Sequence, residues 1–251
     1  MIVGVGAALV LLWAINRPAS LVRVATPTAL SAKFERVVFG RDSGPDRETV
    51  TKWGASIGIV IATPLPDYLR QTLQDTLSEL KRLSGLNIGL ARGADDGTIE
   101  IHYARHADFA SIVRRFDPFR TKSLSWLRSV NCFFSGILNN HKFERAVIGI
   151  ADDLGEQGAK SCVLEELYQG LGPGKDSMAL LPSISSSQGT QTALSINDKI
   201  ILRALYDERI TPGMPRARAM AIAREVIAEL VAAVKARGEA ALTHPRYRPG
   251  R

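Results

Sequence analysis

Acidic and amide side chains in residues 162–176 have the types and spacing that could do chemistry. Glu165 and Gln169 are four residues apart, so in a helix both project from one face, with Glu166 on the flank. A glycine turn follows, and then Lys175 and Asp176. Glu165, Gln169 and Asp176 are therefore candidate ligands for a cation. A set of oxygen ligands suits calcium, magnesium or manganese better than zinc.

The same side chains could also act without a metal. Two ionised carboxylates about 4 Å apart repel by about 4 kcal/mol at an effective dielectric of 20. If Glu165 or Glu166 meets Asp176 in a cleft, one of them keeps its proton near neutral pH and general acid–base hydrolysis becomes feasible, for instance of a glycan. Consecutive helix residues do not face each other, however, and Lys175 could neutralise either acid. A purely structural interpretation also stands, because acidic residues are favoured near a helix N-terminus.

The helix resembles the HExxHxxG helix of the zincin metallopeptidases, with Glu165 and Gln169 in place of the two histidines. Residues 181–185 resemble the turn beneath the metal in metzincins, and residues 196–206 resemble the helix that follows that turn. Over roughly residues 46–236 the combination is similar to a bacterial family of exported proteins known only as a domain of unknown function. The positions that match its pattern are Cys162, Glu165, Glu166, Gln169, Leu171, Gly172, Leu205, Tyr206, Asp207, Pro212, Gly213 and Met214.

The resemblance implies catalytic roles for Glu166, as base, and for Glu165. It implies substrate-binding roles for Gln169, Asp176 and Lys175. Lys175 departs from the family, because it puts a cation where a third metal ligand is expected, and Ser185 replaces the metzincin methionine. None of the four histidines lies in this segment, so we expect a divalent cation, if any, rather than an ordinary zinc site.

Two functions remain open from these residues. The first is a hydrolase of the cell envelope that resembles a metallopeptidase. The second is a catalytically inactive zincin-like module whose cleft binds a peptide, a glycan or an envelope protein. The first predicts an open cleft that Glu166 reaches, whereas the second predicts side chains already satisfied by neighbours, Lys175 above all.

The elements that must position this site follow from hydrophobic periodicity. It predicts strands over 57–61, 86–91, 98–103, 130–138 and 145–150, and helices over 67–83, 106–116, 160–171, 198–206 and 216–233. The order predicts an α+β fold of the zincin type. It would have a twisted mixed sheet, an active-site helix and a C-terminal helical half.

The ends of the chain bear on compartment. An apolar run over residues 2–15 predicts a signal peptide or signal anchor within 1–20, so we expect a periplasmic or secreted protein that this segment could anchor. A linker over 21–45, the domain over 46–236 and a frayed basic tail over 237–251 complete the predicted organisation. In an oxidising compartment Cys132 and Cys162 would form a disulfide, whereas in the cytosol they would be buried thiols.

Composition narrows the function classes. The chain has 251 residues, 45% of them hydrophobic and 23% charged, which excludes disordered and fibrous classes. The formal charge is +7, but the basic residues are scattered, so we expect no nucleic-acid partner and no membrane contact beyond the N-terminal segment. A basic, aromatic segment over 114–128 could bind an anionic polymer or surface, although a solvated basic face is favoured.

Overall fold

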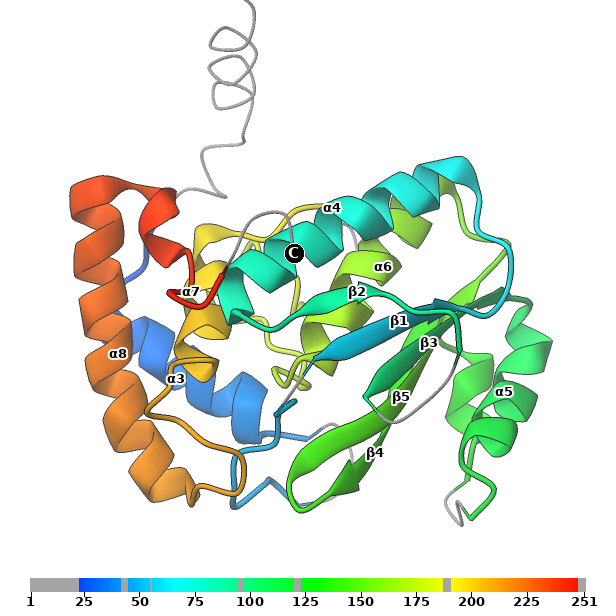
Figure 1. The fold of residues 1–251 in the computed structure, drawn as a ribbon, viewed down its shortest axis with the longest axis horizontal. Coiled ribbons are helices and arrows are strands. Elements are labelled where there is room, and N and C mark those ends of the chain that lie inside the picture. Colours follow the sequence, from blue (N-terminus) through cyan, green and yellow to red (C-terminus); the bar gives the residue numbers. More distant parts are fainter. Residues whose placement is uncertain are drawn as a thin grey trace, which may run out of the picture.

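A five-stranded mixed sheet forms the centre of the protein in a computed structural model that describes residues 23–41, 45–54, 56–93, 97–119, 123–186 and 191–247 (Figure 1). The spatial order is β2-β1-β3-β5-β4, which makes β2 and β4 the two edges. All neighbouring pairs are parallel except β4 and β5. The strands are β1 (Ile57–Ile61), β2 (Ile88–Leu90), β3 (Thr98–Ala104), β4 (Cys132–Asn139) and β5 (Lys142–Ala151).

Helices cover both faces of this sheet. The helices α4 (Asp67–Ser84) and α6 (Glu156–Gly170) share one core with Ala146, Ile148 and Ile150 of β5. Val147 points to the opposite face, because side chains alternate along a strand. There it packs in a second, smaller core with α5 (Phe109–Phe116), which follows the 3-10 helix η1 (His106–Asp108) and precedes η2 (Ser125–Arg128).

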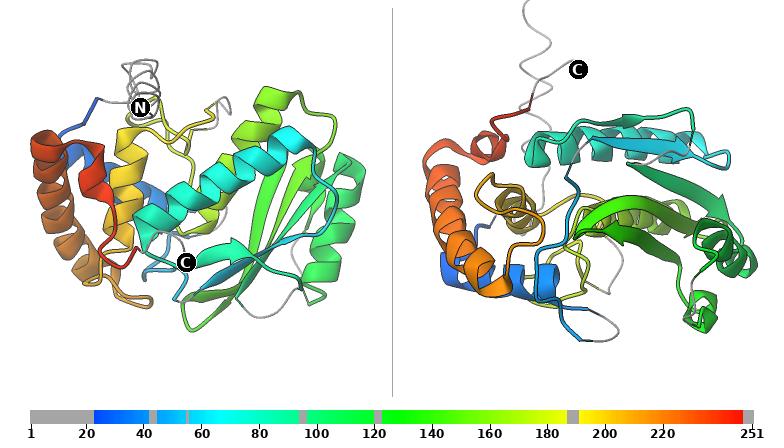
Figure 2. Two further views of the ribbon diagram at one scale, coloured as in Figure 1. Left: turned by 45° about the horizontal axis from the view of Figure 1, so that its top comes forward. Right: turned by 60° about the horizontal axis from the view of Figure 1, so that its bottom comes forward.

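The remaining helices form a separate layer beside the sheet (Figure 2). This layer contains α7 (Ile196–Leu205), α8 (Arg216–Arg237) and η3 (Glu239–Leu242), and α3 (Pro27–Phe39) packs against α8. The α+β class, the mixed sheet and the C-terminal helical half are thus confirmed. The largest differences in bounds are that α6 begins four residues earlier than predicted and that α8 ends four residues later.

The predicted linker over 21–45 is wrong where α3 stands. Thr26 caps the helix by accepting a hydrogen bond from the backbone N–H of Ala29, and Pro27 occupies the first turn, where its missing N–H costs nothing. Leu30, Phe34 and three further apolar residues of α3 are fully buried. The prediction failed because the flanking prolines indicated a tether, although Thr-Pro is also a helix start.

The frayed tail over 237–251 is likewise wrong for its first part. Leu242 is fully buried and His244 is 2% exposed. The His244 ring packs against Gly85, where a Cβ atom would come within 2.2 Å of Nδ1. The predicted signal segment within residues 1–20 lies outside the described residues. Within the described part of the chain, no helix combines the length and hydropathy needed to cross a bilayer.

Candidate functional site

A groove of about 750 Å³ runs between the edge strand β4 and helix α6. Five consecutive residues of β4, 132–136, line it. Because their side chains alternate between the two faces, such a continuous run means that the groove follows the open edge of the strand. From α6, the groove is lined by Gly158, Cys162, Glu165, Glu166 and Gln169. The groove therefore contains the predicted catalytic residues.

A disulfide joins the two walls. Cys132 of β4 and Cys162 of α6 are bonded, with their Cα atoms 5.8 Å apart, as predicted. Further along the helix, a Cβ atom on Gly170 would lie 2.7 Å from the Phe134 ring, so glycine lets strand and helix approach closely there. The spacing of the groove walls is fixed by a covalent bond at one point and by close packing at another.

The C-terminus of α6 is held by side chains from distant elements. The indole N–H of Trp53 donates to the carbonyl of Gly170 at 2.9 Å, and the hydroxyl of Tyr206 donates to that of Leu171 at 2.8 Å. Gly172 then turns the chain with φ +131°, where a Cβ atom would lie 2.7 Å from Leu205 and 3.1 Å from a backbone oxygen. Only glycine suits this backbone conformation. The turn brings Asp176 back to the helix.

Glu165, Gln169 and Asp176 lie together in the groove. The side-chain amide of Gln169 donates to Asp176 Oδ1 at 2.8 Å and approaches Glu165 Oε1 at 3.4 Å. Burial and the negative charge of Asp176 raise the pKa of Glu165 to about 8. At neutral pH Glu165 is therefore mostly protonated, and the amide of Gln169 bridges its carboxyl group to that of Asp176.

Glu166 lies deeper in the same groove and is 6% exposed. Burial, followed by the charges of Glu165 and Asp176, raises its pKa well above the usual range. Among the described residues, Glu166 has no hydrogen-bond or ion-pair partner. The predicted role as base needs a carboxylate, whereas this environment holds the proton on.

Lys175 does not line the groove. Its ammonium donates to the backbone carbonyl of Arg41 at 2.6 Å, at the far side of the glycine turn. A binding module was expected to pair Lys175 with the acids of the site, whereas here its ammonium contacts a backbone carbonyl outside the groove. Arg41 and Arg47 line the groove instead.

The fit of a cation can be judged from the donor set. Within the described ranges no three His, Cys, Asp or Glu side chains are placed to hold a metal ion. In the candidate set, Gln169 directs its amide N–H group at both acids, and an amide nitrogen that donates hydrogen bonds cannot coordinate a cation. The arrangement as it stands does not fit a metal ion.

Sequence reasoning missed several groove residues. Phe119, Trp126 and Leu138 line the groove and are 92%, 41% and 47% exposed. Two of them belong to the basic, aromatic segment that was interpreted as a solvated face. The available signal was the clustering of large aromatic residues in one short segment, since a contiguous exposed apolar patch marks an interaction site.

Comparisons with known proteins place the chain in a family without placing it near a characterised relative. Residues 27–225 match the family described as "Protein of unknown function (DUF2927)". The match begins at Pro27, the first residue of α3, in agreement with the packing of that helix into the core. No curated protein and no solved structure matches the chain. The chain belongs to the DUF2927 family of proteins of unknown function.

Proposed function

We propose that the groove binds an extended polypeptide segment alongside β4, in a domain of zincin-like descent. The observation on which this rests is the open edge of β4. In the sheet order β4 is terminal, and five of its consecutive residues line the groove. An edge strand presents unpaired backbone N–H and C=O groups, which an extended peptide can pair with as an added strand.

The side chains of the groove support an apolar ligand. Three of the large apolar residues that the described chain exposes, Phe119, Trp126 and Leu138, line this groove. Main-chain pairing supplies affinity for any extended peptide, and such pockets supply preference for its alternate side chains. We therefore expect the bound segment to bear aromatic or large aliphatic residues.

Zincin-like descent is supported by the order of features along the chain. A helix with EExxQ ends at a glycine turn, which returns Asp176 to the position where a third ligand would approach Gln169. Loss of both histidines fits a cleft that kept its ligand-binding role while its metal chemistry was replaced.

Export is part of the same proposal. The disulfide between Cys132 and Cys162 lines the groove, and structural disulfides persist in oxidising compartments. The N-terminal apolar run points in the same direction. We infer a periplasmic or secreted protein whose ligands are peptides or proteins of the envelope.

Binding can be tested with fluorescein-labelled peptides from β-casein, a natively unfolded polypeptide, by fluorescence anisotropy. Leu138→Ala should weaken binding about tenfold, as expected when one large aliphatic contact is lost. Leu90→Ala is the matched control, because Leu90 is 61% exposed on β2, the other edge of the sheet, and lies outside the groove. Absence of binding, or equal loss in both variants, would overturn the proposal.

A second candidate is hydrolysis of the bound chain, and the paired acids favour it. Asp176 would accept a proton from water as the water oxygen attacks the peptide carbonyl carbon. Glu165, protonated near neutral pH, would donate its proton to the departing nitrogen. A protonated carboxyl group beside a second carboxyl group is a recurrent acid–base device.

Cleavage is tested by mass spectrometry of unlabelled β-casein incubated with the protein between pH 5 and 9. New termini should be lost in Glu165→Gln and retained in Glu156→Gln, since Glu156 lies in the first turn of the same helix, 59% exposed and paired with Lys160. Binding without cleavage by the wild-type protein would reject hydrolysis and leave the peptide-binding proposal standing.

A further inference from the structure

A second hollow, of about 880 Å³, lies between α5 and η2, away from the predicted catalytic residues. One face of α5, with Ala110, Ser111 and Arg114, forms one wall. The other face of the same helix packs into the small core through Phe109, Ile112, Val113 and Phe116. Arg114 therefore projects into the hollow because the apolar stripe fixes the rotation of the helix.

The lining of this hollow is basic. Arg114 from α5 and Arg128 from η2 both line it, and no carboxylate does among the residues that the structure describes. Neither guanidinium has a hydrogen-bond or ion-pair partner among the described residues. The adjacent acid Asp108 is paired with Arg105 at 3.0 Å. Two arginines from different elements thus face one space without a counter-charge.

Further polar atoms line the same space. The hydroxyls of Ser123 and Ser125 are 3.1 Å apart and hydrogen-bond to each other, so one of their two hydrogens is available to a ligand. His106 also lines the hollow, with Nδ1 3.3 Å from a carboxylate oxygen of Asp153. Its other ring nitrogen adds a polar atom to a site of guanidinium and hydroxyl donors.

We propose that this hollow binds a phosphate group, held by Arg114 and Arg128. A guanidinium presents paired N–H donors that match phosphate oxygens, and two unpaired guanidiniums can hold one phosphate from two sides. The basic segment for which the sequence left open an anionic ligand is thereby given one. A soluble phosphate ester and a phospholipid headgroup share this chemistry.

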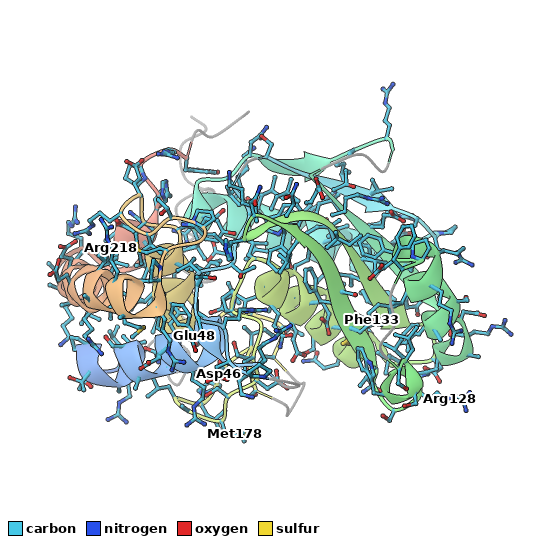
Figure 3. All side chains as sticks on the ribbon, turned by 90° about the horizontal axis from the view of Figure 1, so that it is seen from below. Asp46, Glu48, Arg128, Phe133, Met178 and Arg218 are labelled. Carbon is cyan, nitrogen blue, oxygen red and sulfur yellow. A yellow bond between two sulfur atoms is a disulfide. The ribbon has the colours of Figure 1, made fainter. Side chains whose placement is uncertain are left out.

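The test measures binding of glycerol 3-phosphate by isothermal titration calorimetry, and of vesicles with and without phosphatidylglycerol by sedimentation. The variant Arg114→Ala/Arg128→Ala should weaken phosphate binding about tenfold or more. The variant Arg218→Ala/Arg224→Ala removes the same charge from exposed positions on α8, where Arg218 lies at the opposite end of the molecule from Arg128 (Figure 3). This control should bind as the wild type does.

The outcomes separate the sources of phosphate. Loss of glycerol 3-phosphate binding in the hollow variant alone supports a soluble ester, whereas loss confined to phosphatidylglycerol vesicles supports a headgroup. Arg114→Lys/Arg128→Lys should bind with intermediate affinity, because it keeps charge and loses the paired donors. Equal loss in both alanine variants, or no binding of either probe by the wild type, would overturn the proposal. Far-UV circular dichroism checks that each variant is folded.

Discussion

Two regions of the protein bury carboxyl groups in opposite ways. Asp198 on α7 is fully buried and receives hydrogen bonds from Lys33, Ser183, Ser195 and the backbone N–H of Ile184. In the groove, by contrast, buried acids repel one another. Burying a carboxylate costs little free energy where an opposite charge and hydrogen bonds compensate it. Where they do not, the carboxyl group keeps its proton instead.

The difference separates structural residues from candidate functional ones. The Asp198 cluster ties α3, α7 and the loop containing Ser183 together, and Lys33 is 1% exposed. Its groups already satisfy one another, so little remains for a ligand. Glu165 and Glu166 line an open groove, where burial and the charges of neighbouring acids raise the pKa of each. Uncompensated burial of this kind is typical of functional sites.

The largest expected effect comes from breaking the compensated region. Asp198→Ala leaves the Lys33 ammonium buried without a counter-charge, so we expect a loss of about 3–5 kcal/mol in the free energy of unfolding. Urea denaturation measures it. Asp75→Ala, on the exposed face of α4, should change stability by less than about 0.5 kcal/mol. A small effect of Asp198→Ala would show that the cluster is not a structural tie.

Removing the disulfide should have the second largest effect on stability. It should also affect the groove, because the bond joins the two groove walls. The bond closes a loop with a sequence separation of 30, so its loss in Cys132→Ser/Cys162→Ser should cost about 2–4 kcal/mol of unfolding free energy. Because the bond joins β4 to α6, affinity for the β-casein peptides should fall together with stability. Unchanged peptide affinity in the folded variant would show that close packing alone fixes the groove walls.

The sequence predicted the helices and strands better than it predicted which side chains contact one another. Apolar periodicity predicted the sheet, α4 and α7 to within a few residues, because burial of one face dominates their formation. The spacing of Glu165, Gln169 and Asp176 made them a candidate set, and the structure brings them together. The spacing could not predict that Lys175 turns to a backbone carbonyl, because that depends on where the chain around Arg41 lies.

Nothing in the sequence indicated the buried cluster, for the same reason. Ser183 resembled part of a turn beneath a metal, yet it bonds Asp198 and Lys33, which are 15 and 150 residues away. Lys33 lay in the predicted linker, so no buried partner was expected for Asp198. Tertiary contacts between distant segments decide which buried carboxylates have an opposite charge and hydrogen-bond donors beside them. The spacing of residues along the chain does not reveal these contacts.

A pH titration tests the uncompensated region directly. The pKa of Glu165 is raised on folding, so the folded state binds the proton more tightly and loses stability as the pH rises from about 4.5 to about 8. Glu165→Gln removes this dependence. We expect the variant to match the wild type near pH 4 and to be about 1–2 kcal/mol more stable at pH 8. Urea midpoints measured across this range decide it, with Glu156→Gln as the control.

The smallest effect on stability should come from His244, a titratable side chain that is buried and hydrogen-bonded through both ring nitrogens. The Nε2–H group donates to the carbonyl of Tyr206 at 3.0 Å, and Nδ1 accepts from the backbone N–H of Arg246. Both nitrogens are thus satisfied only in the neutral ring. Burial, then the charge of Arg203, lowers its pKa, although nearby Glu208 acts in the opposite direction.

The sign of this effect is opposite to that of Glu165. A histidine with a lowered pKa favours the folded state fully above its unfolded pKa of about 6.5, and this contribution is lost as the pH falls below that value. We expect His244→Gln to lose about 1 kcal/mol at pH 7.5 and progressively less relative to the wild type towards pH 5. His141→Gln, in the exposed turn after β4, is the matched control. If the gap between His244→Gln and the wild type stays constant with pH, the buried ring does not titrate there, and the acids of the groove alone set the pH dependence.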